Sequence, residues 1–194
     1  MTIDSRTRWF ALYVLCLASL MIVLDVTIVN VALPSIRQNL GFSETSLAWV
    51  VNAYLLTYGG FLLLGGRLGD LFGHRRLFPS GITLFTLASL ACGLATSQWF
   101  LVSARAVQGV GGAIASAVSL SLMMTLFTEP AERAKAMGVI GFVAAGGGSI
   151  GVLAGGLLFL SSGMPVGRRG GQAFAGILLA AAGVLWVLAI RWGH

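Results

Sequence analysis

The chain has 194 residues, of which 57% are hydrophobic and only 9% are charged, and its formal net charge is +6. A soluble domain usually carries about 25% charged residues, so this composition excludes an ordinary soluble globule. The basic residues are scattered between apolar runs and form no single basic face, which argues against nucleic acid as a partner. The positive charge instead indicates the cytoplasmic basic bias of a membrane protein.

Long apolar runs predict how the chain is organised. A helix needs about 20 mainly apolar residues to cross a hydrocarbon core of about 30 Å. The runs predict an all-α membrane protein, a six-transmembrane-helix bundle with spans at 9–33, 47–66, 78–97, 101–123, 137–160 and 173–191. The expected divisions are a tail at 1–8, the first five spans within 9–160, a Gly/Pro/Arg loop at 161–172, and the last span with a short tail at 173–194.

Charges between the runs predict the orientation of the spans. Basic residues precede the first run and follow the second, fourth and sixth: Arg6, Arg8, Arg67, Arg75, Arg76, Arg133, Lys135 and Arg191. The positive-inside rule places these ends, and with them the N-terminus, in the cytoplasm. Arg168 and Arg169 break the pattern, because they lie on the opposite side if all six runs insert.

The densest cluster of charged and turn-forming residues runs from Gly65 to Phe78, between the second and third runs. Bare charges and unpaired backbone groups are costly in hydrocarbon, so this stretch belongs in water or among lipid headgroups. We therefore expect a loop here that reverses the chain between two helices.

Small residues recur every four positions in two of the predicted spans. They are Gly109, Ala113, Ala117 and Ser121 in the fourth span, and Gly147, Gly151 and Gly155 in the fifth. Such strips let helix backbones approach closely within a membrane. Generic close packing explains either strip alone, but two strips together predict a compact bundle rather than a simple anchor.

Asp25 is an ionisable residue inside the first predicted span, where a charge costs about 3 kcal/mol or more. Thr27 and Asn30 add polar groups nearby, and Pro34 is expected to end the helix. A carboxylate in such a place can bind and release a proton or pair with a cation. A purely structural cap or ion pair is the alternative.

Arg105 is the second such residue, close to the start of the fourth span, and Gln108 follows one turn later. An arginine that only anchors its helix at the interface is the alternative here.

No catalytic or metal-binding constellation competes with these residues, because the two histidines lie far apart and the two cysteines occupy separate apolar runs. We therefore expect neither an enzyme nor a metal site.

The stretch from Gly66 to Phe78 resembles the signature between the second and third spans of the major facilitator superfamily. The matching positions are Gly66, Leu68, Gly69, Asp70, Gly73 and Arg75, and Arg76 keeps the basic end. Leu71 and His74 stand where arginine is usual. The resemblance implies that Asp70, with Arg75 and Arg76, is part of a cytoplasmic gate.

Three more stretches resemble motifs of the fourteen-span drug:proton antiporters in that superfamily. They are Leu24 to Pro34 in the first span, Arg105 to Gly112 in the fourth, and Gly147 to Gly156 in the fifth, where Val152 replaces the usual proline. The resemblance implies a proton and substrate site at Asp25, Thr27, Asn30, Arg105 and Gln108. It also implies an antiporter hinge at Gly147, Gly151, Gly155 and Gly156.

The function that this resemblance implies is proton-coupled efflux of hydrophobic or cationic drugs across the bacterial cytoplasmic membrane, driven by the proton gradient without a cofactor. The resemblance ends near residue 160, and two motifs expected around the sixth span are absent. Three interpretations stay open: a truncated N-terminal half that is inactive alone, a half-transporter completed by a second copy or chain, and a non-transporting protein that binds a full-length relative.

Overall fold

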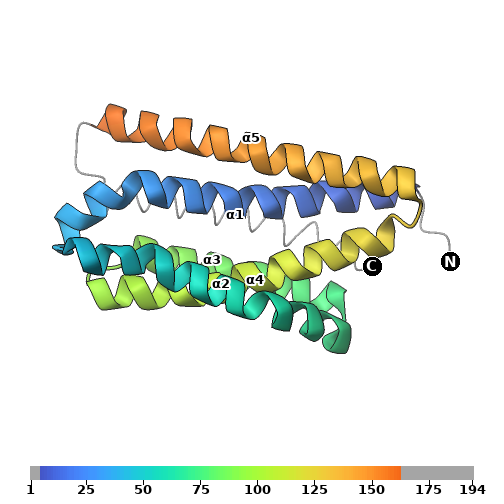
Figure 1. The fold of residues 1–194 in the computed structure, drawn as a ribbon, viewed down its shortest axis with the longest axis horizontal. Helices are drawn as coiled ribbons and strands as arrows, with labels where there is room; N and C mark the ends of the chain where they lie inside the picture. Colours follow the sequence, from blue (N-terminus) through green and yellow to red (C-terminus); the bar gives the residue numbers. More distant parts are fainter. Residues whose placement is uncertain (1–4, 163–194) are drawn as a thin grey trace.

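A computed structural model describes residues 5–162, which form five α-helices (Figure 1). The helices are α1 (Ser5–Leu40), α2 (Glu44–Phe72), α3 (His74–Gly93), α4 (Gln98–Leu126) and α5 (Pro130–Ser162). Short connections join them, so successive helices run in opposite directions along one long axis (Figure 1). The predicted sixth span at 173–191, and the predicted loop beyond Ser162, lie outside the described residues.

Four of these helices are long and apolar enough to cross a membrane. The qualifying segments are Thr7–Leu40, Glu44–Phe72, Gln98–Leu126 and Pro130–Leu153. α3 (20 residues) is not among them, and its first turn carries the polar residues His74, Arg75 and Arg76. The all-helical membrane class is confirmed, and the described residues form five helices, four of which are long and apolar enough to be spans.

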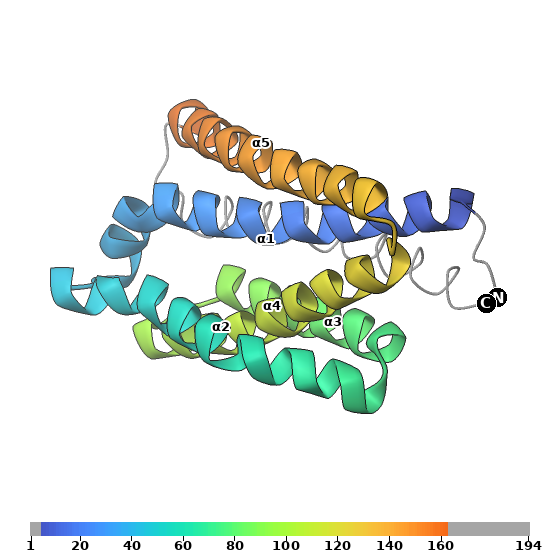
Figure 2. The ribbon, with the colours of Figure 1, turned by 45° about the vertical axis from the view of Figure 1, so that its right-hand side comes forward.

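Pro34 does not end the first helix, contrary to the prediction. α1 continues for six more residues to Leu40, and its ribbon changes direction near that end (Figure 2). Proline removes one backbone N–H and crowds the preceding turn, which kinks a helix but need not stop it when the following turn is packed. Here that turn is packed, since Ile36 and Leu40 contact the buried cluster of Phe42, Val50 and Leu101.

The loop predicted at Gly65 to Phe78 is almost entirely helical. α2 runs through Phe72 and α3 begins at His74, so Gly73 alone makes the reversal. Its φ of +87° is a conformation that glycine adopts without steric cost, and its N–H donates to the Gly69 carbonyl at 3.0 Å. The charged residues of the stretch therefore project from two helix ends rather than from a loop.

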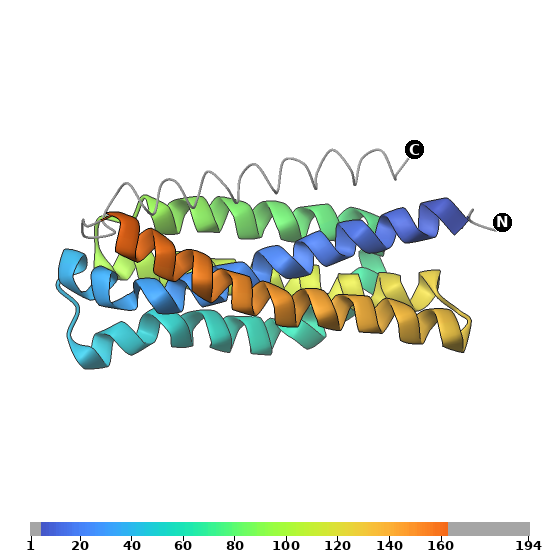
Figure 3. The same cartoon turned by 90° about the horizontal axis from the view of Figure 1, so that it is seen from above.

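The described helices form two groups. α4 packs most extensively against α2 and α3, whereas α1 packs most extensively against α5. Figure 2 shows α1 and α5 side by side above the other three, and Figure 3 shows α5 crossing over α1. The groups meet mainly where α1 contacts α4. A polar contact between α1 and α4 therefore lies at the joint between the two groups.

Glycines on α4 set the spacing within the larger group. A Cβ atom added at Gly109 would lie 2.5 Å from the Tyr54 carbonyl oxygen of α2, and one added at Gly111 would lie 2.5 Å from the Phe85 nitrogen of α3. These neighbours are backbone atoms, which cannot move aside as a side chain can. The predicted close helix approach at the fourth-span strip is thus confirmed at Gly109, while Gly111 adds a second contact face.

Candidate functional site

Arg105 lies near the start of α4, where its buried guanidinium group joins three helices. Its Nε donates to the Val50 carbonyl oxygen of α2 at 3.2 Å. Its Nη1 donates to Asp25 Oδ2 of α1 at 2.7 Å and to Gln108 Oε1, one turn along α4, at 2.6 Å. Because arginine stays charged in proteins, this arrangement fixes a positive charge inside the bundle.

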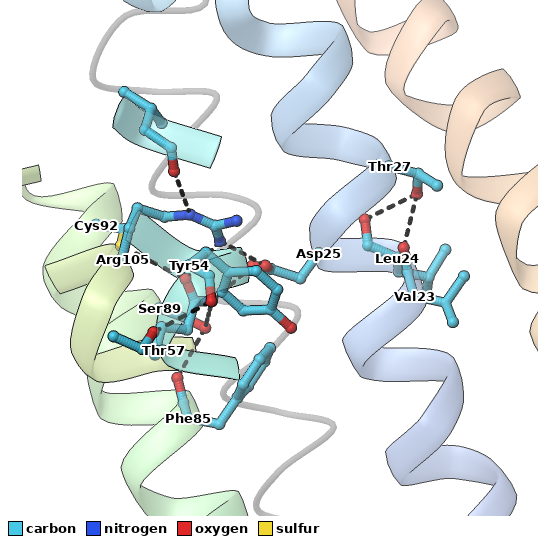
Figure 4. A network of polar contacts seen from close by, with 12 residues as sticks. Val23, Leu24, Asp25, Thr27, Tyr54, Thr57, Phe85, Ser89, Cys92 and Arg105 are labelled. Carbon is cyan, nitrogen blue, oxygen red and sulfur yellow. Dashed lines mark hydrogen bonds and ion pairs between the residues drawn. The ribbon is translucent and has the colours of Figure 1, made fainter. Parts of the chain in front are cut away.

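Asp25 is the buried counter-charge, and it points from α1 towards Arg105 (Figure 4). Each carboxylate oxygen accepts one hydrogen bond, Oδ2 from Arg105 and Oδ1 from Gln108 Nε2 at 2.7 Å. A buried charge is tolerated only when it is paired and hydrogen-bonded, and here both conditions are met. The contact crosses the joint between the α1–α5 pair and the other three helices.

Gln108 is fully buried, and both polar atoms of its amide, Nε2 and Oε1, have hydrogen-bond partners. Its Nε2 also donates to Ser89 Oγ of α3 at 2.5 Å, and its Oε1 lies 3.7 Å from the donor Cys92 Sγ. Ser89 in turn donates to the Phe85 carbonyl oxygen at 2.8 Å. These contacts fix the orientation of the amide and extend the charge network to a fourth helix.

Tyr54 of α2 covers one face of the guanidinium group. The Arg105 Cζ atom lies 4.3 Å from the centroid of the Tyr54 ring, a distance at which a cation is attracted to an aromatic face. Tyr54 stacks on Tyr58 with centroids 5.7 Å apart and an interplanar angle of 19°. The network therefore contains Tyr54 and Ser89, which the sequence analysis missed because single tyrosines and serines are ordinary in apolar runs.

Thr27 and Asn30 do not join this network. Thr27 Oγ1 donates to the Val23 and Leu24 carbonyl oxygens, both at 3.0 Å, and lies on the side of α1 that faces α5 (Figure 4). Asn30 is exposed. Residues two apart on a helix are rotated by about 200°, so neighbours in sequence face opposite ways. Of the five residues predicted for the site, the structure brings together Asp25, Arg105 and Gln108.

The predicted gate residues lie around the reversal between α2 and α3. The exposed Asp70 places Oδ1 3.5 Å from Nε2 of His74, one turn later. The His74 ring packs on Gly69, where an added Cβ would lie 3.0 Å from its Cδ2 atom. The other predicted members are Gly66, half-buried in α2, Gly73, which makes the reversal, and Arg75 and Arg76, which are exposed on α3.

The predicted hinge glycines lie on α5, and two of them contact α1. A Cβ at Gly147 would meet Leu20, and one at Gly151 would meet Thr27 and Leu24. Gly155 and Gly156 lie further along α5, where side-chain surroundings are outside the described part of the structure. α5 contains no internal proline, and Val152 at the usual proline position is exposed. Close packing is confirmed at Gly147 and Gly151, and the hinge role stays a prediction.

Comparison with known proteins gives the family. The profile of the Major Facilitator Superfamily matches residues 15–192. The chain is 54% identical over 151 residues to the puromycin resistance protein pur8 of Streptomyces alboniger, covering 78% of this chain and 30% of that protein. It is 45% identical over 162 residues to the cephamycin export protein CmcT of Amycolatopsis lactamdurans, covering 82% and 33%. The chain thus spans about a third of the length of these relatives.

Two solved transporters share the fold. The proton:xylose symporter XylE superposes with a TM-score of 0.83 at 18% sequence identity, over 97% of this chain and 45% of that one. A bacterial homologue of the lysosomal transporter Spinster superposes with a TM-score of 0.76 at 19% identity, over 98% and 43%. The apolar helices, the family profile and the relatives all indicate an integral membrane protein. The family and the relatives are transporters, not enzymes. The chain belongs to the major facilitator superfamily.

Proposed function

We propose that this chain forms the proton-binding part of an exporter, one that moves drugs or other small amphipathic compounds out of a bacterial cell in exchange for protons. The observation that carries the proposal is the buried Asp25 carboxylate, held by Arg105 on one oxygen and by Gln108 on the other. The relatives that are named for drug resistance and antibiotic export support the efflux direction.

In this proposal, protonation of Asp25 has a mechanical consequence. A proton on the carboxylate cancels its attraction to Arg105, while the guanidinium group keeps its contacts with Val50 and Gln108. The α1–α5 pair then loses its ionic link to the α2–α4 group, and the relative position of the two groups can change. Drug binding would favour one position and proton binding the other, which is the coupling that exchange requires.

We also propose that the end of the bundle at which α1 begins faces the cytoplasm. This end carries the Arg8–Glu132 ion pair at 2.8 Å and the Lys135 ammonium 5.1 Å from the Trp9 ring centroid, together with Arg76 and Arg133. At the other end, the Arg37 charge is balanced by Glu44 at 3.0 Å. The positive-inside rule therefore favours this orientation, in the bacterial cytoplasmic membrane.

Labelling of introduced cysteines tests the orientation. Thr96 and Thr128 are exposed at opposite ends of α4 and suit this purpose. In intact cells, a membrane-impermeant maleimide should label Thr96→Cys but not Thr128→Cys, and cell lysis should make both react. The opposite pattern in intact cells would place the N-terminus outside and contradict the proposed orientation. Unsubstituted protein reports any background from Cys16 and Cys92.

The transport proposal needs the rest of a transporter, because the superfamily binds substrate between two repeats. We suggest a chimera in which this chain replaces the region of the puromycin resistance protein to which it aligns. Puromycin is the first drug to test. The chimera should restore proton-driven puromycin efflux to cells that lack it, whereas the chain expressed alone should not. Efflux by the chain alone, with a cross-linked dimer, would instead favour a transporter made of two copies.

Substitution of Asp25 in the chimera tests the proton site. Asp25→Asn keeps the shape but cannot exchange a proton, so proton-driven efflux should be lost while drug binding persists. Asp25→Glu should retain part of the activity. Glu44→Gln is the matched control, because it makes the same chemical change at an exposed ion pair. Asp25→Asn chimeras that export the drug as fast as the unsubstituted chimera would refute the proposal.

A further inference from the structure

The hydroxyl group of Tyr54 is a buried polar group that the charge network does not use. Only 2% of Tyr54 is exposed, yet its Oη atom has no hydrogen-bond partner among the described residues. The ring of the same residue covers Arg105, and the hydroxyl lies at the far end of that ring (Figure 4). Buried hydroxyls in proteins are normally satisfied by protein or by ordered water, so this group calls for a partner.

Gly112 of α4 lies against this hydroxyl. A Cβ atom added at Gly112 would lie 3.2 Å from the Tyr54 Oη atom and 3.4 Å from Cδ2 of Tyr58. One turn further along α4, Ser116 Oγ accepts a hydrogen bond of 3.0 Å from the Tyr58 hydroxyl. The two tyrosine hydroxyls therefore approach α4 at successive turns, the first at Gly112 and the second at Ser116.

These residues lie along the contact between α2 and α4. On α2 the contact includes Val50, Tyr54 and Tyr58, and on α4 it includes Arg105, Gln108, Gly112 and Ser116. Spacings of three and four residues keep each set on one side of its helix. α2 and α4 run in the same direction, so the contact leads from Arg105 towards the end of the bundle where α1 begins, over about 16 Å to Ser116.

We propose that Tyr54, Tyr58 and Ser116 form a hydroxyl relay that carries the proton between Asp25 and Ser116, in the direction of that end of the bundle, with a water molecule bound at the Tyr54 hydroxyl as the connecting step. The proton leaves the Asp25 carboxyl for this water, and each hydroxyl then accepts a proton on its oxygen as it passes its own onward. One proton moves, no other bond changes, and rotation of the hydroxyls restores the relay. This inference rests on the proposed function.

Three substitutions in the chimera test the relay. Tyr54→Phe and Tyr58→Phe remove one hydroxyl each but keep both rings, including the ring over Arg105. Tyr13→Phe is the matched control, because Tyr13 is 65% exposed on α1. Tyr54→Phe and Tyr58→Phe should each slow proton-driven efflux about tenfold or more and increase its solvent deuterium isotope effect. Drug affinity, and drug exchange measured without a proton gradient, should stay unchanged.

The same experiment separates failure of the relay from failure of the proposed function. If both phenylalanine variants behave like Tyr13→Phe while Asp25→Asn abolishes efflux, the relay is refuted and the proton site stands. If Asp25→Asn leaves proton-driven efflux intact, the proposed function fails. Slower drug exchange without a gradient would show that the hydroxyls are structural, which also overturns the relay. Should Tyr54→Phe fail to fold, Tyr58→Phe and Ser116→Ala decide the outcome through the same readouts.

Discussion

Two arginine–carboxylate pairs in this molecule have similar geometry and opposite surroundings. Arg105 and Asp25 approach to 2.7 Å with side chains that are each 3% exposed, at a junction of four helices. Arg37 and Glu44 approach to 3.0 Å with side chains that are 48% and 80% exposed, where α1 passes to α2. Each pair joins an arginine Nη1 atom to one carboxylate oxygen, and the large difference between the pairs is their exposure to water.

The two pairs differ in what happens when one partner is removed: the fold should lose much of its stability at the buried pair and little at the exposed pair. An exposed pair contributes about 0–1 kcal/mol, because water and salt screen it. Desolvation of a buried pair can cost as much free energy as its attraction returns, yet loss of one partner leaves the other charge stranded. A buried pair is therefore poor evidence for stability alone, and its place at the joint of the two helix groups agrees with the proposed proton site.

The largest expected effect comes from breaking the buried pair on one side. Arg105→Leu leaves Asp25 as an unpaired buried carboxylate and removes the link to Val50, which should cost about 3–5 kcal/mol of unfolding free energy. Unfolding of the purified chain in detergent, followed by circular dichroism against temperature, checks this. Adding Asp25→Leu should recover part of the loss. If Arg105→Leu alone were as stable as the unsubstituted chain, the distinction between the buried and the exposed pair would be wrong.

An intermediate effect is expected from the neutral partner of the carboxylate. Gln108→Leu keeps the volume but removes the amide that binds Asp25 and Ser89, and each group left unsatisfied costs about 1–3 kcal/mol. The charge pair itself survives in this variant. Its melting temperature should therefore fall between those of Arg105→Leu and the unsubstituted chain. A drop as large as that of Arg105→Leu would mean that the amide matters as much as the charge.

The smallest effect is expected at the exposed pair. Arg37→Gln removes the contact with Glu44 but leaves both positions in water, so the unfolding free energy should change by less than about 1 kcal/mol. The difference should shrink further in high salt. A shift comparable to that of Arg105→Leu, or one that salt does not alter, would show that exposure does not distinguish the two pairs.

The sequence identifies the ionisable and amide residues of the buried network, but not the tyrosine and the serine that contact them. Asp25, Arg105 and Gln108 stand out because ionisable or amide groups are rare in apolar runs. The rotation of each helix decides which residues can pair with another helix. Thr27 is two residues from Asp25 in the sequence, but it faces α5 instead of Arg105. Tyr54 and Ser89 carry no signal in a single sequence, because only tertiary packing brings them to Arg105 and Gln108.

Two predictions of where helices begin and end were also wrong. The predicted reversal at Gly65 to Phe78 was placed correctly between two helices, but its charges and glycines suggested a loop where one glycine with positive φ suffices. Pro34 was expected to end α1, yet packing of the following turn keeps that turn helical. After Pro34 tertiary contacts outweigh the local preference of the residues, whereas at Gly73 the backbone freedom of one glycine is enough to reverse the chain.

Proton release on drug binding tests the central claim most directly. Addition of the transported drug to the purified chimera in weakly buffered detergent should release protons, because drug and proton binding favour different positions of the two helix groups. Asp25→Asn should bind the drug without this release, and Glu44→Gln should release as many protons as the unsubstituted chimera. Equal proton release from Asp25→Asn would contradict the assignment of Asp25 as the proton site.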